Sequence, residues 1–152
     1  DYIIAHGLYA WVPVPVRDAL FDLIGRVLAP EGVAFVSYNT LPGGHFRLAV
    51  RDLMRHVIPA DADPAVKLGT ARDVLRQFVK PQPGDGPAMT AYRHQAAHTL
   101  EQPDGLLFHD ELTEEYHPRL HIDVVADAGR RGLAFLAEAT KASDPGANQQ
   151  VA

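Results

Sequence analysis

The sequence contains no cysteine among its 152 residues. This absence excludes disulfide cross-links and thiolate metal sites, and it agrees with a reducing compartment, so we expect a cytoplasmic protein. Long hydrophobic runs are also absent. None approaches the roughly 18 residues that a membrane-spanning helix requires, and no signal peptide is recognisable. We therefore expect no membrane partner.

Positive charge is scarce as well. The chain carries 14 lysine and arginine residues against 19 aspartate and glutamate residues, which gives a formal net charge of -5. Nucleic-acid binding depends on clustered cationic side chains that release counterions from the phosphates. A nucleic-acid partner is therefore not expected. With 152 residues, of which 47% are apolar, the chain can form the buried core of about one domain.

The first third of the chain has the pattern of a strand, a helix and a second strand. Residues 2–5 form a short apolar run, and apolar residues recur at three- and four-residue spacing over residues 14–28, which predicts one face of a helix. Pro30 and Gly32 end that helix, because proline cannot continue it and glycine readily forms the following turn. Residues 33–38 are apolar enough for a strand buried on both faces. This pattern predicts a βαβ unit with parallel strands.

We expect this chain to be part of a longer protein. It opens at Asp1, directly before the first apolar run. Two parallel strands that are buried on both faces need more neighbours than each other. The missing strands are therefore expected upstream of Asp1.

The middle of the chain is predicted to be helical, and its end to return to the sheet. Three amphipathic stretches, separated by breaks rich in proline and glycine, predict helices over residues 46–57, 64–78 and 88–100. The elements expected after them are a short segment that can be extended, a helix, a strand and a flexible polar tail, at residues 106–112, 122–131, 133–137 and 141–152.

Several of these segments carry a family resemblance. The stretch DYIIAHGLYAWVP, from Asp1 to Pro13, resembles the fourth strand and following loop of class I S-adenosylmethionine-dependent methyltransferases. The stretch RVLAPEGVAFVS, from Arg26 to Ser37, resembles their next helix end and fifth strand. The stretch VSYNTLPGGHFR, which begins at Val36, resembles a group of prokaryotic methyltransferases that carry a methyltransferase regulatory domain after the fifth strand.

The resemblance continues to about residue 140, since residues 107–112 (LFHDEL) and 132–139 (GLAFLAEA) fit the same family in the same order. Two features depart from it. Gly44 stands where the family is expected to have a bulky aromatic residue. The glycine-rich cofactor loop after the first strand of the family, and the acidic residues that grip the ribose and adenine, are absent from the sequence.

The resemblance implies an α/β fold, namely a partial Rossmann-like methyltransferase sheet (βαβ) with a helical insertion and a returning helix and strand. It implies that residues 1–45 are the C-terminal part of a catalytic domain, that residues 46–140 are a mainly helical regulatory region, and that residues 141–152 are a flexible tail. The cofactor that it implies is S-adenosyl-L-methionine. The implied partners are the remainder of the methyltransferase domain and a methyl acceptor of unknown identity, and the chain alone is expected to be inactive.

The loop after the first strand is the candidate cofactor site. Open α/β sheets bind ligands at the carboxyl ends of their parallel strands, and in the resembled fold this loop borders the methionine end of the cofactor. The candidate cofactor-binding residues are therefore His6, Gly7, Tyr9 and Trp11. The two aromatic rings could stabilise the sulfonium charge by cation–π attraction, or they could simply pack over the helix at residues 14–28.

The loop after the second strand is the candidate substrate site, because it lies at the same edge of the sheet. The candidate substrate-binding residues are Asn39, Pro42, Gly43 and His45. Histidine side chains exchange protons near neutral pH, so His45 could orient or deprotonate an acceptor. It could equally cap the helix that begins near Phe46. No catalytic residue is assigned from the sequence.

Two histidine pairs have the four-residue spacing that zinc sites use, His94 with His98 and His117 with His121. The first pair lacks the glutamate of the metalloprotease pattern, and Pro118 interrupts the second. We therefore interpret all four as solvated histidines and expect no metal.

Three arginines, Arg47, Arg51 and Arg55, also recur at four-residue spacing. They could present a patch to an anionic substrate or a partner, or they could form an ordinary polar helix face.

Two other functions of the chain stay open. One is a non-catalytic interaction module in which residues 46–140 dock another protein, and the other is a metal-dependent hydrolase that uses the histidine pairs.

Overall fold

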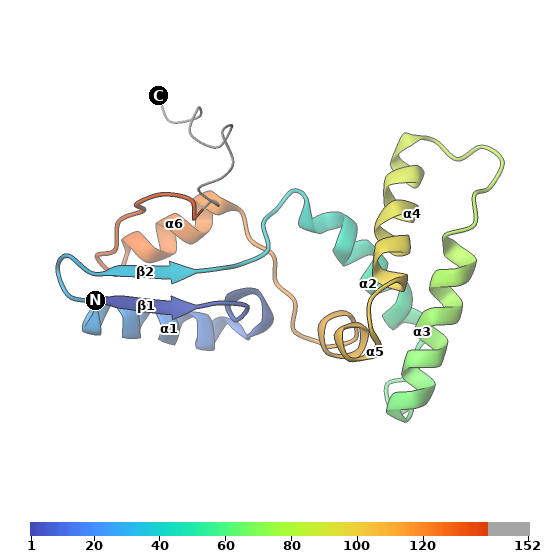
Figure 1. Ribbon diagram of the computed structural model, residues 1–152, viewed down its shortest axis with the longest axis horizontal. Coiled ribbons are helices and arrows are strands. Elements are labelled where there is room, and N and C mark those ends of the chain that lie inside the picture. The colour runs from blue at the N-terminus through green and yellow to red at the C-terminus, as the bar shows by residue number, and fades with distance from the viewer. Residues whose placement is uncertain (140–152) are drawn as a thin grey trace. The chain divides into compact units, whose positions relative to one another are not determined.

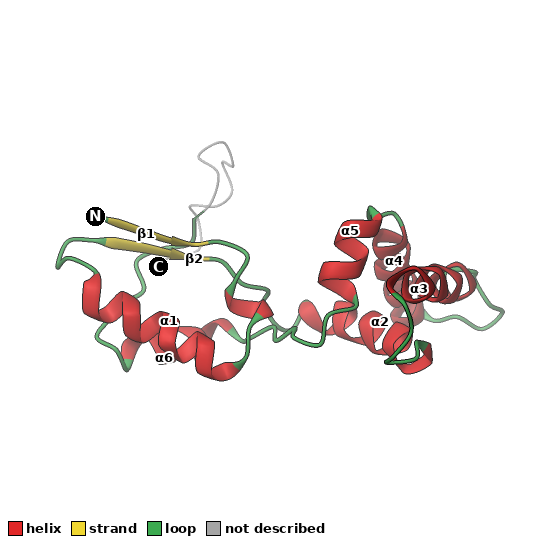
Figure 2. Cartoon of the chain, turned by 90° about the horizontal axis from the view of Figure 1, so that it is seen from below, coloured by secondary structure: helices red, strands yellow, loops and turns green. Residues whose placement is uncertain are grey.

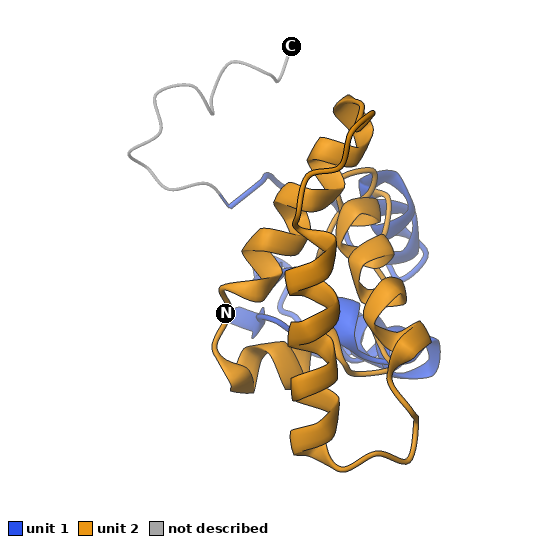
Figure 3. Ribbon diagram, turned by 90° about the vertical axis from the view of Figure 1, so that its right-hand side faces the viewer, with its two compact units in different colours: residues 1–38, 121–152 blue, residues 39–120 orange. Residues whose placement is uncertain are grey.

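A computed structural model describes residues 1–139, and the tail predicted at residues 141–152 lies outside the described residues. The described chain forms two compact units, which Figure 3 colours separately. The α/β unit consists of residues 1–38 and the described residues from His121 onward, and the helical unit consists of residues 39–120. The predicted division at residue 45 concerns function rather than compactness, and it stays a prediction.

The α/β unit is built on a strand, a helix and a parallel strand. The strands are β1 (Tyr2–Ala5) and β2 (Val33–Val36), and α1 (Val14–Val27) connects them. The strands pair in parallel from Tyr2 opposite Val33 to Ala5 opposite Val36. The predicted parallel βαβ unit is therefore confirmed. A single 3-10 turn, Tyr9–Trp11, lies between β1 and α1.

Within residues 1–139, one face of this small sheet is covered and the other is open. Figure 2 shows α1 and α6 (His121–Gly129) on the same side of the strands. Tyr9, Phe21, Ile24 and Val124 form the buried core on that side. On the other face Tyr2 is 83% exposed and Ile4 is 74% exposed. The sequence predicted strands that are buried on both faces. In the described part of the chain they are buried on one face only, because no element there covers the second face.

The prediction of a strand at residues 133–137 is wrong. These residues form no ladder with either strand, and Leu136 is 77% exposed. The Phe135 ring instead meets the edge of the His121 ring, with 4.8 Å between ring centroids. An apolar run forms a strand only where backbone partners are available to it, and apolar character alone does not supply them.

α1 and the segment after α6 approach each other closely at Gly25. A Cβ atom placed on Gly25 would lie 2.8 Å from the carbonyl oxygen of Arg131. The Arg131 guanidinium also joins the two elements, because it donates to Asp22 at 2.7 Å and to Asp18 at 3.0 Å. Glycine at position 25 therefore permits this contact.

Replacing Gly25 by alanine should lower the free energy of unfolding of the α/β unit by about 2 kcal/mol, because the backbone of Arg131 has to shift. Trp11 is the one tryptophan of the sequence and lies in this unit, so its fluorescence during urea denaturation reports the change. Gly129→Ala is the matched control, since a Cβ there meets nothing within 4 Å. Equal midpoints for the two variants would contradict the prediction.

The helical unit contains three long helices, as predicted, which Figure 1 shows together with the short α5. Their bounds are α2 (Gly44–Val57), α3 (Pro64–Phe78) and α4 (Pro87–Leu100). Pro64 and Pro87 stand in the first turn of their helices, where the missing N–H of proline has no intrahelical partner to lose. The three helices pack against one another around a buried apolar core that comprises Val50, Met54, Ala71, Leu75, Ala96 and Leu107.

Residues 106–112 are not extended. α5 (Asp104–Leu106) begins directly after Pro103 and continues into a π-helical turn, Leu107–Glu111. Leu107 is fully buried in the core of the helical unit, and this burial favours the helical turn over an extended path. Within residues 1–139, no helix is both long and apolar enough to span a bilayer.

Candidate functional site

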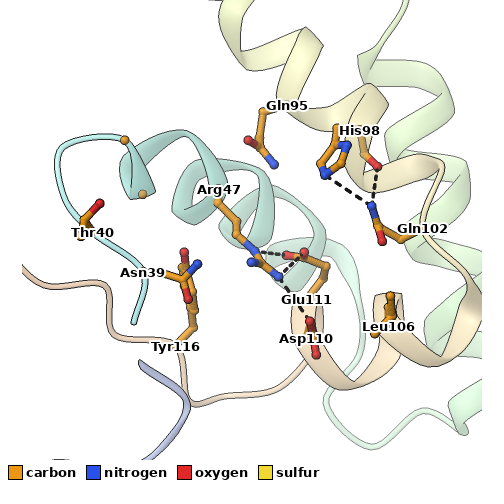
Figure 4. A pocket seen from close by; sticks show the side chains of 12 residues that line it. Asn39, Thr40, Arg47, Gln95, His98, Gln102, Leu106, Asp110, Glu111 and Tyr116 are labelled. Carbon is orange, nitrogen blue, oxygen red and sulfur yellow. Dashed lines mark hydrogen bonds and ion pairs between the residues drawn. The ribbon is translucent and has the colours of Figure 1, made fainter. Parts of the chain in front are cut away.

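The helical unit contains a pocket of about 450 Å³, which is within the size range of small-molecule sites. Figure 4 shows its lining, which is mainly polar and comes from the start of α2, from α4 and from the π-helical turn with the segment after it. The lining residues are Asn39, Thr40, Gly43, Gly44, Arg47, Gln95, His98, Gln102, Leu106, Asp110, Glu111 and Tyr116.

Backbone pairing fixes the rim of the pocket before α2. The Leu41 N–H donates to the carbonyl of Arg119 at 3.0 Å, and the Arg119 N–H donates to the carbonyl of Asn39 at 3.0 Å. A Cβ on Gly44 would lie 2.8 Å from the Cβ of Pro118. The contact explains why this chain has no bulky residue at position 44, because Pro118 occupies the space.

A charged cluster forms the floor of the pocket. Two nitrogens of the Arg47 guanidinium contact the Glu111 carboxylate, with Nη2 at 2.7 Å from Oε1 and Nε at 3.2 Å from Oε2. Asp110 lies farther away, at 3.7 Å from Nη2. The Glu111 side chain is 5% exposed, so this forked pair is largely shielded from solvent.

Arg51 lies beneath Arg47, one helical turn further along α2, and is 1% exposed. Its guanidinium donates to the carbonyl oxygens of Asp110 and Thr113. It also lies 4.7 Å from the centre of the Tyr116 ring. Burial lowers the pKa of Arg51 to about 10, against the opposing attraction of Glu111, so the guanidinium stays charged at neutral pH. Arg51 therefore fastens the π-helical turn to α2 and places the carboxylates at the pocket.

The substrate residues predicted from the sequence gather at one rim of this pocket. Asn39 and Gly43 line it, whereas Pro42 and His45 are exposed beside it and do not line it. His45 is the second residue of α2, where its backbone N–H donates to the Pro42 carbonyl at 3.1 Å. No side-chain hydrogen bond caps the start of α2, so His45 does not act as the helix cap that was one alternative.

Sequence reasoning missed the charged floor of the pocket. The interpretation of the arginine stripe as an ordinary polar face fails for Arg47 and Arg51, which are half-buried and buried, and holds for Arg55, which is exposed. The only available signal was their spacing on one helix face. Glu111 carried no such signal, because its partners lie about 60 residues away in the sequence.

The histidine pairs do not assemble into a metal site. His94 and His98 are both exposed, and the His98 ring lies 3.4 Å from the Gln102 amide nitrogen. His117 pairs with Glu115 at 2.5 Å, while His121 belongs to the α/β unit. Among residues 1–139, no group of three or more histidine, aspartate or glutamate side chains is placed to hold a metal ion.

The cofactor residues predicted from the sequence surround the carboxyl end of β1 in the α/β unit. His6 is exposed and stacks on Phe35, with 6.2 Å between ring centroids. Gly7 has a φ of 66°, a conformation that favours glycine, and its N–H donates to the Ser37 hydroxyl at 2.8 Å. Tyr9 is 1% exposed and Trp11 is half-buried. The burial of Tyr9 favours the packing alternative for that ring.

A second polar contact in the α/β unit joins Tyr38, just after β2, to the start of α6. The Tyr38 hydroxyl lies 2.8 Å from Nδ1 of His121, and its ring packs 5.8 Å from that of Tyr9. Burial raises the pKa of the Tyr38 phenol above its ordinary value of 10, and the charge of Glu138 adds to the effect.

This pKa shift predicts a loss of stability at alkaline pH. A phenol whose pKa is raised by folding stabilises the folded state fully below its unfolded pKa of 10, and this contribution disappears as the pH rises through the folded pKa. We expect the Trp11-detected melting temperature to fall above about pH 10. The fall should be smaller in Tyr38→Phe and unchanged in Tyr2→Phe, because Tyr2 is 83% exposed. An equal fall in all three proteins would refute this assignment.

Comparison with known proteins finds relatives that are similar to this chain in sequence. No family model matches the chain. Over 140 residues, 91% of its length, the chain is 33% identical to the uncharacterized protein RP789 of Rickettsia prowazekii, covering 25% of that protein. The chain is 24% identical, again over 91% of its length, to the uncharacterized protein sll1526 of Synechocystis, and the match covers 28% of sll1526.

The solved structures of PKMT2 from Rickettsia typhi are similar in both fold and sequence. One matches with a TM-score of 0.72 and 28% identity, over 86% of this chain and 24% of that one. PKMT2 in complex with AdoHcy matches with a TM-score of 0.75 and 29% identity, over 89% of this chain and 26% of that one. The chain thus spans about a quarter of the length of the relatives it matches. The fold of this chain is methyltransferase-like.

Proposed function

We propose that this chain is part of a longer S-adenosylmethionine-dependent methyltransferase. In this proposal the α/β unit supplies the end of a Rossmann-like cofactor-binding sheet, and the helical unit is a regulatory or substrate-lid region. The observation that carries the proposal is the TM-score of 0.75, over 89% of this chain, with PKMT2 in complex with AdoHcy. The parallel βαβ unit supports it, because such sheets bind ligands at the carboxyl ends of their strands.

The open face of the sheet supports the proposal that more of the same protein covers it. Tyr2 and Ile4 expose most of their apolar surface there, and water contact with such surface is unfavourable. The relatives are about four times as long as the segment that they share with this chain. We therefore assign the remainder of the methyltransferase domain as the partner that packs on this face.

The residues at the carboxyl end of β1 fit the methionine end of S-adenosylmethionine, which supplies the methyl group when bound. His6 and Gly7 are exposed there and Trp11 is half-buried, while Tyr9 is buried. Arg17, in the first turns of α1, has two guanidinium nitrogens without a hydrogen-bond partner among the described residues. A cation with unused donors suits the carboxylate of this cofactor.

In the helical unit we propose that the pocket receives a polar part of the methyl acceptor. Asn39, Pro42, Gly43 and His45 form or flank one rim, and the Arg47–Glu111 pair lies at the floor. The support for this role is the polar lining, which offers both hydrogen-bond donors and acceptors to a ligand.

Calorimetric titration with S-adenosylhomocysteine tests the proposed function. The full-length protein should release binding heat, and the 152-residue chain alone should not, because it lacks the glycine-rich loop of the family. The rival function, an interaction module, predicts no heat with the full-length protein and capture of a protein partner by residues 46–140 alone. Absence of binding to the full-length protein would overturn the methyltransferase proposal.

A further inference from the structure

Arg17 is a buried cation without a counter-charge in the described part of the chain. It is 5% exposed, and its Nε and Nη1 atoms have no hydrogen-bond partner among residues 1–139. Its guanidinium lies over the face of the Tyr9 ring, with Cζ 5.7 Å from the ring centre. A cation–π contact of this kind offsets only part of the free energy that a buried charge loses on leaving water.

The position of Arg17 on α1 makes its burial unusual. Arg17, Phe21 and Ile24 follow one another at four- and three-residue spacing, so Arg17 stands on the face of α1 that packs into the core of the α/β unit. Apolar side chains are expected on such a face, and arginine is almost never fully buried unless it is paired. Something beyond packing therefore accounts for the guanidinium at this site.

The acidic residues nearest to Arg17 along α1 form ion pairs with another arginine, Arg131. Asp18 lies 3.0 Å from Nη2 of Arg131, and Asp22 lies 2.7 Å from Nε of the same side chain. Neither carboxylate forms an ion pair with Arg17 in the structure. The counter-charge for Arg17 has to come from outside the described residues.

We infer that Arg17 binds a carboxylate presented at the carboxyl end of β1. A carboxylate neutralises the guanidinium and accepts two parallel N–H donors, which neither a carbonyl nor a hydroxyl group does. Two sources share this chemistry. One is an acidic side chain of the longer protein, and the other is the methionyl carboxylate of S-adenosylmethionine, a source that rests on the proposed function.

The first arm of the test measures stability with Arg17→Met, which removes the charge and keeps an unbranched apolar stem. In the 152-residue chain, where Arg17 is unpaired, the melting temperature should rise by about 4 °C. In the ligand-free full-length protein it should fall by a similar amount if a protein carboxylate is the partner. Arg26→Met is the matched control, since Arg26 is exposed on the same helix. Arg17→Lys, which retains a charge, should restore most of any loss and serves if Arg17→Met does not fold.

The second arm compares ligands on the full-length protein by calorimetry. If the cofactor is the partner, Arg17→Met should bind S-adenosylhomocysteine at least about tenfold more weakly, because the variant loses a charge-assisted hydrogen-bonded pair. Its affinity for the decarboxylated analogue should equal that of the unchanged protein. If the protein is the partner, both affinities are retained and the melting temperature falls.

The inference is overturned if Arg17→Met behaves like Arg26→Met in both arms of the full-length protein. Its failure is distinguishable from failure of the proposed function. If the unchanged full-length protein does not bind S-adenosylhomocysteine, the methyltransferase proposal fails, and the stability arm alone then decides whether Arg17 has a carboxylate partner in the protein.

Discussion

Replacing Glu111 by alanine should lower the free energy of unfolding of the helical unit by about 3 kcal/mol. The Glu111 side chain is 5% exposed and lies between two arginines, at 2.7 Å from Arg47 and 3.9 Å from Arg51. Its removal leaves both guanidinium groups without their nearest negative charge in a largely dry site. Arg51 is the more severe case, because its own side chain is only 2% exposed and cannot regain water.

The measurement is urea denaturation followed by far-ultraviolet circular dichroism, in which the three long helices of the helical unit contribute strongly. Glu114→Ala is the matched control, because Glu114 is exposed three residues further along the chain. Its effect should stay within about 0.5 kcal/mol. A loss in Glu111→Ala that is no larger than the loss in Glu114→Ala would show that the cluster does not hold the π-helical turn to α2.

A double-mutant cycle with Arg47→Met separates the two arginines. If Glu111 acts mainly through its forked contact with Arg47, the coupling free energy of the cycle should be about 1 to 3 kcal/mol. A coupling near zero would instead assign the stabilisation to Arg51. The cycle also bears on the pocket, since Arg47 lines it and is oriented by Glu111.

The secondary structure that the sequence predicted correctly depends on local signals. Pro64 places the start of one helix, and Pro30 with Gly32 ends another, because each acts on the backbone next to it. The apolar run at positions 2–5 predicts a strand, and β1 occupies these residues. Such signals act within a few residues, so they can be used without knowing which elements pack together.

The features that sequence reasoning missed depend on distant residues. Spacing placed Arg51 on a helix face but did not show that residues 110–116 cover that face. The segment 133–137 is as apolar as a strand, yet it pairs with no strand among the described residues. The candidate rim at Asn39 and Gly43 was found because it follows a strand directly. The charged floor was not, because its carboxylate arrives from a segment about 60 residues away.

Replacing Leu75 by alanine should also lower the free energy of unfolding of the helical unit by about 3 kcal/mol. Leu75 on α3 is fully buried, and its neighbours in the core include Met54 on α2, Ala96 on α4 and Leu107 in the π-helical turn. Removing its side chain leaves a cavity that four separate elements border. We expect these elements to close on the cavity only in part, because the structure around a deleted core side chain relaxes incompletely.

Leu106→Ala is the matched control for Leu75→Ala, since Leu106 belongs to the same unit and is 48% exposed. It should change the free energy of unfolding by no more than about 0.5 kcal/mol. Far-ultraviolet circular dichroism should show a lower urea midpoint for Leu75→Ala, whereas Trp11 fluorescence should keep its midpoint, because Leu75 contributes to the core of the helical unit and not to that of the α/β unit. Equal dichroism midpoints for the two variants would mean that the core around Leu75 does not stabilise the helical unit. A shift of the Trp11 midpoint by the same amount would mean that the two cores unfold as one.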